Sequence, residues 1–168
     1  MTVARELKLI DTLYNPMSEV DSIFNLSTQL TDNNLLIRPA HLPKIAVIDD
    51  DPLYCRIMTK VADQCHLYIT CFSDLESFFK SYKAETFNVA ILDYYLGPLE
   101  VTDSMSSIEV HNIDIPIVVI SSSNNRQENQ WPDQIKSFIH KALGPYAAID
   151  AAFEAFTIDE LFHQIDKL

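Results

Sequence analysis

Three aspartates of this chain stand where an apolar run gives way to a turn. The run KIAVI at residues 44–48 is followed by Asp49 and Asp50, and the run VAIL at residues 89–92 is followed by Asp93. Short apolar runs bounded by turn residues are typical of strands buried on both faces. Open parallel sheets bind ligands beyond the carboxyl ends of their strands, so Asp93 is predicted to lie at the mouth of a site. The alternative is that Asp93 only caps the next turn.

Two more groups with useful chemistry follow later apolar runs. They are the hydroxyl of Ser121 after residues 115–120 and the ammonium of Lys141 at the end of residues 137–141. Clustered carboxylates repel one another, and Mg²⁺ held through carboxylates, a carbonyl and waters would keep them together. Beside such an ion, Asp93 could attack a phosphoryl group as a nucleophile. Lys141 could pair with the added charge, and Ser121 could donate a hydrogen bond to a phosphoryl oxygen.

The elements that would position these groups alternate along the chain from residue 44. Pro52 suits the first position of a helix, and Ser73 with Glu76 matches a capping box before the next helix. Strands alternating with helices predict βαβ units, hence an α/β doubly wound fold around a parallel sheet whose polar strand ends share one edge. The expected strands are residues 44–48, 67–72, 89–93, 115–120 and 137–141, and the expected helices are residues 53–64, 74–82, 102–111, a short one within 126–134, and 144–156. The first of these helices is expected to carry Leu53, Ile57, Met58 and Val61 on one apolar face.

The first 43 residues precede this alternating region. Apolar residues at helical spacing predict one helix over residues 1–17 and a second from residue 18 to about residue 32. Residues 35–43 contain two prolines and are expected to form an extended linker. This N-terminal helical extension suits either a lid on the domain or a surface for dimerisation or partner binding.

A change of phase marks the last part of the chain. At Thr157 the apolar stripe of the preceding helix is replaced by a new one, and Thr157 with Glu160 matches another capping box. We therefore expect a separate C-terminal helix at residues 157–168. It suits a linker to an output domain of a longer protein, and the alternative is a chain that acts by itself.

Composition excludes several classes of function. The net charge of −12 leaves no basic surface for phosphate backbones, so direct binding of nucleic acid by this chain is not expected. No apolar run is long enough to span a membrane, and the charged N-terminus does not resemble a signal peptide, which predicts a cytoplasmic protein. Gly97 and Gly144 are the only glycines, which rules out the GxGxxG and GxxxxGK nucleotide-binding loops.

Residues 44–156 resemble the receiver domain of two-component response regulators, the CheY-like family. The resemblance rests on VIDDDP around Asp49 and Asp50, ILDYYLGP around Asp93, VVISSS around Ser121 and SFIHKAL around Lys141. It implies a CheY-like, flavodoxin-like doubly wound fold in which a five-stranded parallel sheet has the strand order 2-1-3-4-5.

The resemblance also implies a role for each site residue. Asp93 would be the phosphoacceptor, Ser121 and Lys141 would assist phosphoryl transfer, and Phe138 would be the aromatic switch residue. The Mg²⁺ ligands that it implies are Asp49, Asp50, Asp93 and the backbone carbonyl of Tyr95.

The implied function is a phosphorylation-controlled switch in a phosphorelay, rather than an enzyme acting on other substrates. A sensor histidine kinase or a phosphotransfer protein would supply the phosphoryl group, and the modified chain would change a protein contact, with a homodimer as the obvious output. Two positions depart from the family pattern: Ala142 replaces the usual proline, and Phe138 lacks a hydroxyl. Tyr95 is bulky for its position, and we hypothesise that its ring shields the acyl phosphate from water.

Three alternatives stay open at the level of sequence. In a second register, EAFTIDELF places Glu154 at the lysine site. A degenerate receiver could act as a scaffold that does not depend on phosphorylation. A haloacid-dehalogenase-like phosphatase would use Asp49 as nucleophile and Asp51 as acid, assisted by Ser121 and Lys141.

Overall fold

The computed structural model describes residues 42–83, 86–123 and 131–165, with side chains as far as residue 159. The two helices predicted within residues 1–32 lie outside this part of the chain. Most of the short helix predicted within residues 126–134 also lies outside it, and residues 131–134 are not helical.

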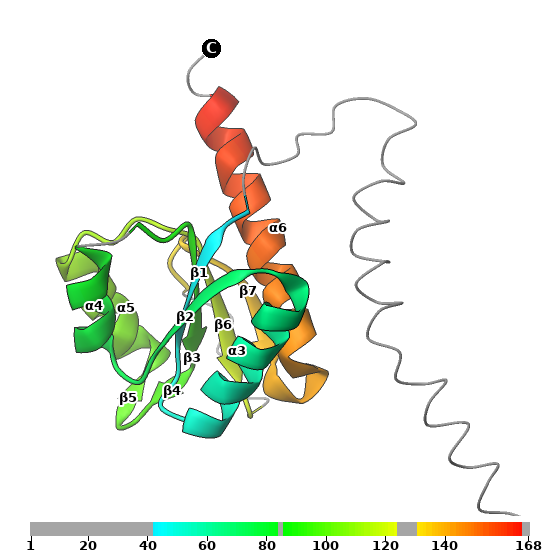
Figure 1. Ribbon diagram of the computed structural model, residues 1–168. Helices are drawn as coiled ribbons and strands as arrows, with labels where there is room; N and C mark the ends of the chain where they lie inside the picture. The colour runs from blue at the N-terminus through cyan, green and yellow to red at the C-terminus, as the bar shows by residue number, and fades with distance from the viewer. Residues whose placement is uncertain (1–41, 84–85, 124–130, 166–168) are drawn as a thin grey trace, which may run out of the picture. The chain divides into compact units, whose positions relative to one another are not determined.

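Five parallel strands form the central sheet (Figure 1). Their order across the sheet is β2-β1-β3-β6-β7, which is the predicted 2-1-3-4-5 because β6 and β7 are its fourth and fifth strands. A separate two-stranded hairpin, β4 (Tyr95–Leu96) with β5 (Leu99–Glu100), follows β3. The strands of the sheet are β1 (Lys44–Ile48), β2 (Tyr68–Phe72), β3 (Val89–Asp93), β6 (Ile117–Ser121) and β7 (Ile135–His140).

Helices cover both faces of this sheet, α3 and α6 on one and α4 and α5 on the other (Figure 1). Alternate residues of β1 serve the two layers, since Ile45 and Val47 pack on the α3 side while Ala46 and Ile48 pack on the α4 side. Burial on both faces explains why the strands are uninterrupted apolar runs, and the predicted fold class is confirmed. The helices are α3 (Pro52–Cys65), α4 (Leu75–Tyr82), α5 (Val101–Val110) and α6 (Gly144–Ile165), and a 3₁₀ turn, Lys141–Leu143, precedes α6.

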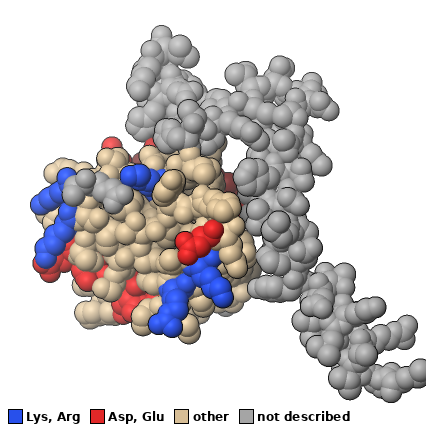
Figure 2. Space-filling model, in the orientation of Figure 1, with Lys and Arg blue, Asp and Glu red and all other residues tan. Residues whose placement is uncertain are grey.

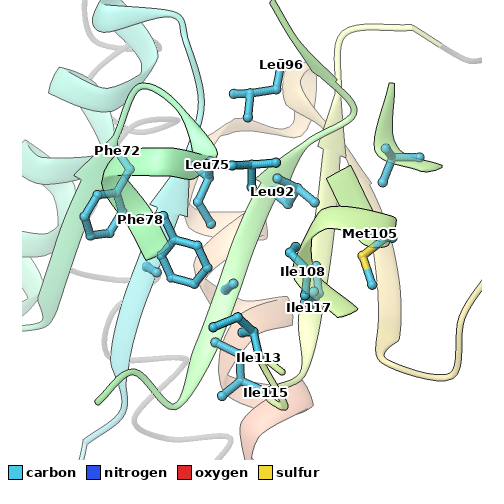
Figure 3. Close-up of a cluster of buried hydrophobic side chains, with 14 of the residues drawn as sticks. Phe72, Leu75, Phe78, Leu92, Leu96, Met105, Ile108, Ile113, Ile115 and Ile117 are labelled. Atoms are coloured by element: carbon cyan, nitrogen blue, oxygen red, sulfur yellow. The ribbon is translucent and has the colours of Figure 1, made fainter. Parts of the chain in front are cut away.

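Aromatic rings pack among aliphatic side chains in the core on the α4 side (Figure 3). The fully buried Phe78 of α4 lies edge-on to Phe72, with ring centroids 5.5 Å apart, and its centroid is 6.0 Å from that of Phe87. Such tilted and edge-to-face contacts stabilise packed rings beyond the area they bury. This layer lies directly behind β1 and β3, so it fixes the two strands that end in acidic residues.

The N-termini of α3 and α4 are both capped by aspartates. Asp51 accepts a hydrogen bond from the backbone N–H of Leu53 at 2.8 Å, and Asp74 accepts one from Ser77 at 2.7 Å. The capping box predicted for Ser73 and Glu76 is therefore wrong. Asp74 stands immediately before the first helical residue, and a carboxylate there is as good an acceptor as a serine hydroxyl.

The C-terminal helix is one continuous element. α6 runs for 22 residues through Thr157, so the predicted C-terminal helix is present as far as Ile165, but the predicted break at Thr157 is wrong. The Thr157 hydroxyl donates to the carbonyl of Phe153, one turn earlier, at 2.8 Å, instead of capping a new N-terminus. This local hydrogen bond lets a threonine remain inside a helix, and the helix passes through the phase change of its apolar stripe.

Truncation of Phe78 tests the aromatic core. Phe78→Ala should lower the free energy of unfolding by about 3–5 kcal/mol, because it leaves a cavity in a fully buried layer. Urea denaturation followed by far-UV circular dichroism measures this loss. Val110→Ala is the control, since Val110 is 76% exposed and its truncation should change stability by no more than about 0.5 kcal/mol. Equal effects of the two substitutions would contradict the packing described.

Candidate functional site

Three carboxylates meet at the carboxyl ends of β1 and β3. One oxygen each of Asp49, Asp50 and Asp93 lies within 4.8 Å of the other two. Asp49 and Asp93 are buried, with 1% and 7% of their surfaces exposed, while Asp50 faces solvent. The three carboxylates converge because the parallel register pairs Ile48 of β1 with Leu92 of β3. The residues that follow these two, Asp49 and Asp93, therefore leave the sheet side by side.

Lys141 supplies the positive charge between the two buried carboxylates. Its Nζ lies 2.7 Å from Oδ2 of Asp93 and 2.7 Å from Oδ2 of Asp49. The ammonium donates a hydrogen bond to Asp93 and forms an ion pair with Asp49, so it bridges the two buried carboxylates. Glu154 is exposed on α6, and the register that puts Glu154 at the lysine site is wrong.

Burial and charge act against each other at this ion pair. Burial raises the pKa of Asp93, and the nearby Asp49 adds to this rise, while the hydrogen bond from Lys141 offsets only part of it. Burial lowers the pKa of Lys141, but its contacts with Asp49 and Asp93 outweigh that effect and leave the pKa raised. Lys141 therefore stays charged at neutral pH, and the ionised form of Asp93 costs folding free energy.

Backbone groups complete the acidic pocket. Asp50 accepts a hydrogen bond from the N–H of Gly97 at 3.1 Å, which ties β1 to the loop after β3. Gly97 has φ +61°, in the left-handed region where glycine is unstrained. The N–H of Tyr95 donates to the Asp93 carboxylate, while the Tyr95 side chain is 41% exposed.

Ser121 lies at the end of β6, but its hydroxyl is not bonded to the carboxylates. It is fully buried, accepts a hydrogen bond from the N–H of Ser123 at 3.1 Å and lies 3.2 Å from the Ser123 hydroxyl. The neighbouring strand brings Asp93 level with Ile120, one residue before Ser121. The structure thus puts Ser121 at the expected strand end, with Ser123 as its partner.

Phe138 belongs to a row of aromatic rings that reaches the acidic pocket. Its centroid is 5.5 Å from that of Trp131 and 6.3 Å from that of Tyr94, the residue after Asp93. The Tyr94 and Tyr95 rings meet at 4.7 Å. A displacement of Phe138 would therefore be felt directly by the loop that carries Asp93.

Tyr54 is a residue of the pocket that the sequence prediction missed. The Lys141 ammonium lies 4.9 Å from the centroid of its ring, and the Tyr54 hydroxyl is buried with no hydrogen-bond partner among the described residues. Burial raises the pKa of Tyr54, and the charges of Asp49 and Asp93 raise it further. The predicted apolar face instead included Leu53 and Ile57, which are 60% and 41% exposed. Tyr54, Met58, Val61 and Ala62 share the helical spacing that would have identified the buried face.

The donor set of this pocket fits a hard divalent cation. Its ligand atoms are carboxylate oxygens on three aspartates, and these oxygens lie within 4.8 Å of one another. Oxygen ligands of this kind, completed by waters and a carbonyl, are those that Mg²⁺ prefers. The soft ligands that zinc prefers are absent from this cluster.

The sheet order and the acidic edge together define an open parallel α/β domain whose acidic residues gather beyond the carboxyl ends of the strands, where sheets of this kind bind ligands. Residues 45–151 match the response regulator receiver domain, and the chain belongs to that family. No curated protein sequence matches it.

Solved receiver domains share the fold at low sequence identity. The Francisella response regulator 1452 receiver domain is 16% identical with a TM-score of 0.59, and the match covers 70% of this chain and 98% of that one. A CheY-like receiver domain protein from Methanospirillum hungatei JF-1 is also 16% identical at a TM-score of 0.59, over 71% of this chain and 99% of that one. The beryllofluoride-activated NtrC4 receiver domain, solved as a dimer, is 16% identical at a TM-score of 0.53, over 67% and 95%.

Removing the charge of Asp93 should stabilise the fold. Asp93→Asn should raise the free energy of unfolding at pH 7 by an amount on the order of 1 kcal/mol, because burial and Asp49 disfavour the ionised carboxylate. The folded state binds the Asp93 proton more tightly than the unfolded state, so this group's contribution to stability falls as pH rises above its ordinary pKa. The gain should therefore disappear below about pH 4, where the carboxyl is neutral in both states.

Denaturant unfolding of the wild type and Asp93→Asn, at several pH values between about 3.5 and 7, measures the difference in their free energies of unfolding. This range starts near the ordinary pKa of an aspartate, which is about 4. Asp114→Asn, which changes an exposed aspartate, serves as the matched control and should have no effect. Destabilisation of Asp93→Asn at pH 7 would contradict the electrostatics described here.

Proposed function

We propose that Asp93 accepts a phosphoryl group from the phosphohistidine of a sensor histidine kinase or phosphotransfer protein in the cytoplasm. The observation that carries this proposal is a buried carboxylate with an ammonium at 2.7 Å, beside two further carboxylates at the open edge of the sheet. Family membership supports it, since receiver domains are signalling switches of two-component systems.

The chemistry assigned to Asp93 is an in-line displacement. A carboxylate oxygen attacks phosphorus and forms the new P–O bond, while the P–N bond to the imidazole breaks and its electron pair stays on the ring nitrogen. Lys141 already contacts Asp93, so its charge is in place to pair with the oxygens of the incoming group. Little movement is required before transfer.

Asp49, Asp50 and Asp93 would hold Mg²⁺ together with the carbonyl of Tyr95. The bound ion would offset the negative charge that gathers on the phosphoryl oxygens during transfer. Asp50 is the exposed member of the set, and the N–H of Gly97 keeps its carboxylate turned toward the loop after β3.

The switch would begin with Ser121 and Lys141. A phosphoryl group on Asp93 would offer oxygens that can accept a hydrogen bond from the Ser121 hydroxyl in place of its contact with the Ser123 hydroxyl, and it would draw the Lys141 ammonium toward itself. Phe138 packs between Trp131 and Tyr94, so it would respond to movement of the loop after Asp93. The surface around β7 would then differ between the unmodified and the phosphorylated protein, because the side chains there would pack in two different arrangements.

The output that we propose is a protein contact, with a homodimer as the first candidate. The NtrC4 receiver offers a precedent, since its activated form was solved as a dimer. On the face seen in Figure 2, Lys and Arg side chains form small separate groups with Asp and Glu among them, which does not favour a nucleic acid as partner of that face. Two exposed leucines suit docking of the phosphodonor protein: Leu53, which is 60% exposed and precedes Tyr54, and Leu143, which is 67% exposed and lies two residues after Lys141.

Asp51 bears on the phosphatase alternative. That mechanism needs Asp51 as the acid, but its carboxylate caps α3 through the N–H of Leu53 at 2.8 Å.

Among the described helices, none combines the length and apolar character needed to cross a bilayer.

Phosphorylation of the isolated chain tests the proposal. Incubation with acetyl phosphate and Mg²⁺ should add one phosphoryl group, seen as a single adduct of about 80 Da by intact-mass spectrometry, because Asp93 is the only acceptor of this design among the described residues. Asp93→Asn should abolish the adduct, whereas Asp114→Asn should leave it unchanged. Size-exclusion chromatography of the modified chain tests the dimer. A folded wild-type chain that forms no adduct would favour the phosphorylation-independent scaffold.

Tyr95 gives a second test, on the lifetime of the phosphorylated state. Its ring packs on Tyr94 beside Asp93, and we expect it to exclude water from the acyl phosphate. Tyr95→Asn should therefore hydrolyse the phosphoryl group several times faster, by roughly threefold to tenfold, a difference of about 1 kcal/mol in the barrier. Decay of the adduct after removal of acetyl phosphate measures the rate. Slower decay in Tyr95→Asn than in the wild type would contradict the shielding role.

A further inference from the structure

The Tyr54 hydroxyl is an unmet donor inside the acidic pocket. Tyr54 is 8% exposed, and its hydroxyl oxygen has no partner among the described residues. A buried polar group without a partner is costly, and native proteins keep few of them. An apolar side chain of similar size would fill the same space on α3 without that cost. The Tyr54 hydroxyl can therefore donate a hydrogen bond to a group that enters the pocket.

The position of Tyr54 indicates where that partner would sit. The face of its ring holds the Lys141 ammonium at 4.9 Å, and that ammonium touches both Asp49 and Asp93. Tyr54 thus borders the space in front of Asp93 from the side of α3.

The chemistry of the Tyr54 hydroxyl limits which groups can be its hydrogen-bond partner. A phenol hydroxyl is a strong neutral donor at neutral pH. Neither unmodified carboxylate accepts its hydrogen bond. A phosphoryl group on Asp93 extends further into the pocket and brings three strong acceptor oxygens.

We propose that Tyr54 is a phosphoryl-binding residue: its hydroxyl donates a hydrogen bond to a phosphoryl oxygen on Asp93, while its ring positions Lys141 for the same group. This inference rests on the proposed phosphorylation of Asp93. It adds a donor from α3 to those from β6 and from the turn after β7, so the phosphoryl group is held from three sides.

Two substitutions separate the hydroxyl from the ring. Tyr54→Phe keeps the ring under Lys141 and removes only the donor, whereas Tyr54→Leu removes both. Tyr68→Phe is the matched control, because it deletes a hydroxyl from a tyrosine that is 68% exposed on the edge strand β2. The measurements are the rate constant for phosphorylation by acetyl phosphate with Mg²⁺, from intact mass, and the melting temperature without phosphodonor.

Tyr54→Phe should slow phosphorylation on the order of tenfold, the effect of losing one hydrogen bond to a charged acceptor, while melting no lower than the wild type. Tyr54→Leu should be slower again by severalfold, because Lys141 loses its support. Tyr68→Phe should match the wild type in both measurements. A stable Tyr54→Phe with reduced rate cannot be explained by a packing role.

Either of two results would overturn the role of Tyr54 without affecting the proposed phosphorylation of Asp93. One is a Tyr54→Phe rate equal to that of the wild type, which would leave the phosphorylation of Asp93 intact. The other is a slower rate matched by a lower melting temperature, which would make Tyr54 a structural residue. A wild-type chain that forms no adduct would instead remove the proposed function, and the inference with it.

Discussion

The crowding of three carboxylates around one ammonium is the constraint on which the rest of this structure depends. Asp49 and Asp93 are held in place by strands buried on both faces, and Lys141 reaches both of them from the turn after β7. One positive charge cannot balance three negative ones, so the pocket is electrostatically incomplete as folded. The hydrophobic layers behind it, with Phe78 at the centre of one, supply the stability that this deficit removes.

Much of this arrangement is visible in the sequence because it depends on chain order. Each buried strand is an apolar run, and Asp49, Asp93 and Ser121 stand at the ends of such runs. In a parallel sheet, strand ends must meet at one edge, so the residues that gather there follow from topology alone. Lys141 was harder to assign, because Glu154 also lay in a segment of family-like pattern. The contact of Lys141 with Asp93, made from the turn after β7, decides between them, because Glu154 is exposed on α6.

Features that depend on helical phase or on local competition for hydrogen bonds were not predictable in the same way. Adjacent helical residues point about 100° apart, so an error of one position exchanged the buried Tyr54 for the exposed Leu53. Asp74 displaced Ser73 as a cap, since both can accept from the first turn and their relative positions decide. Thr157 turned its hydroxyl back to Phe153, which no capping pattern can reveal.

The continuity of α6 has a mechanical consequence. A helix of 22 residues is a rod about 33 Å long, and it starts three residues after Lys141, at the edge of the sheet that carries the carboxylates. Its other end runs past the opposite edge (Figure 1). A tilt of about 5° at its base would move that far end by about 3 Å. The rod would thus act as a lever arm, turning a small tilt at the end beside Lys141 into a displacement large enough to alter a contact at its far end.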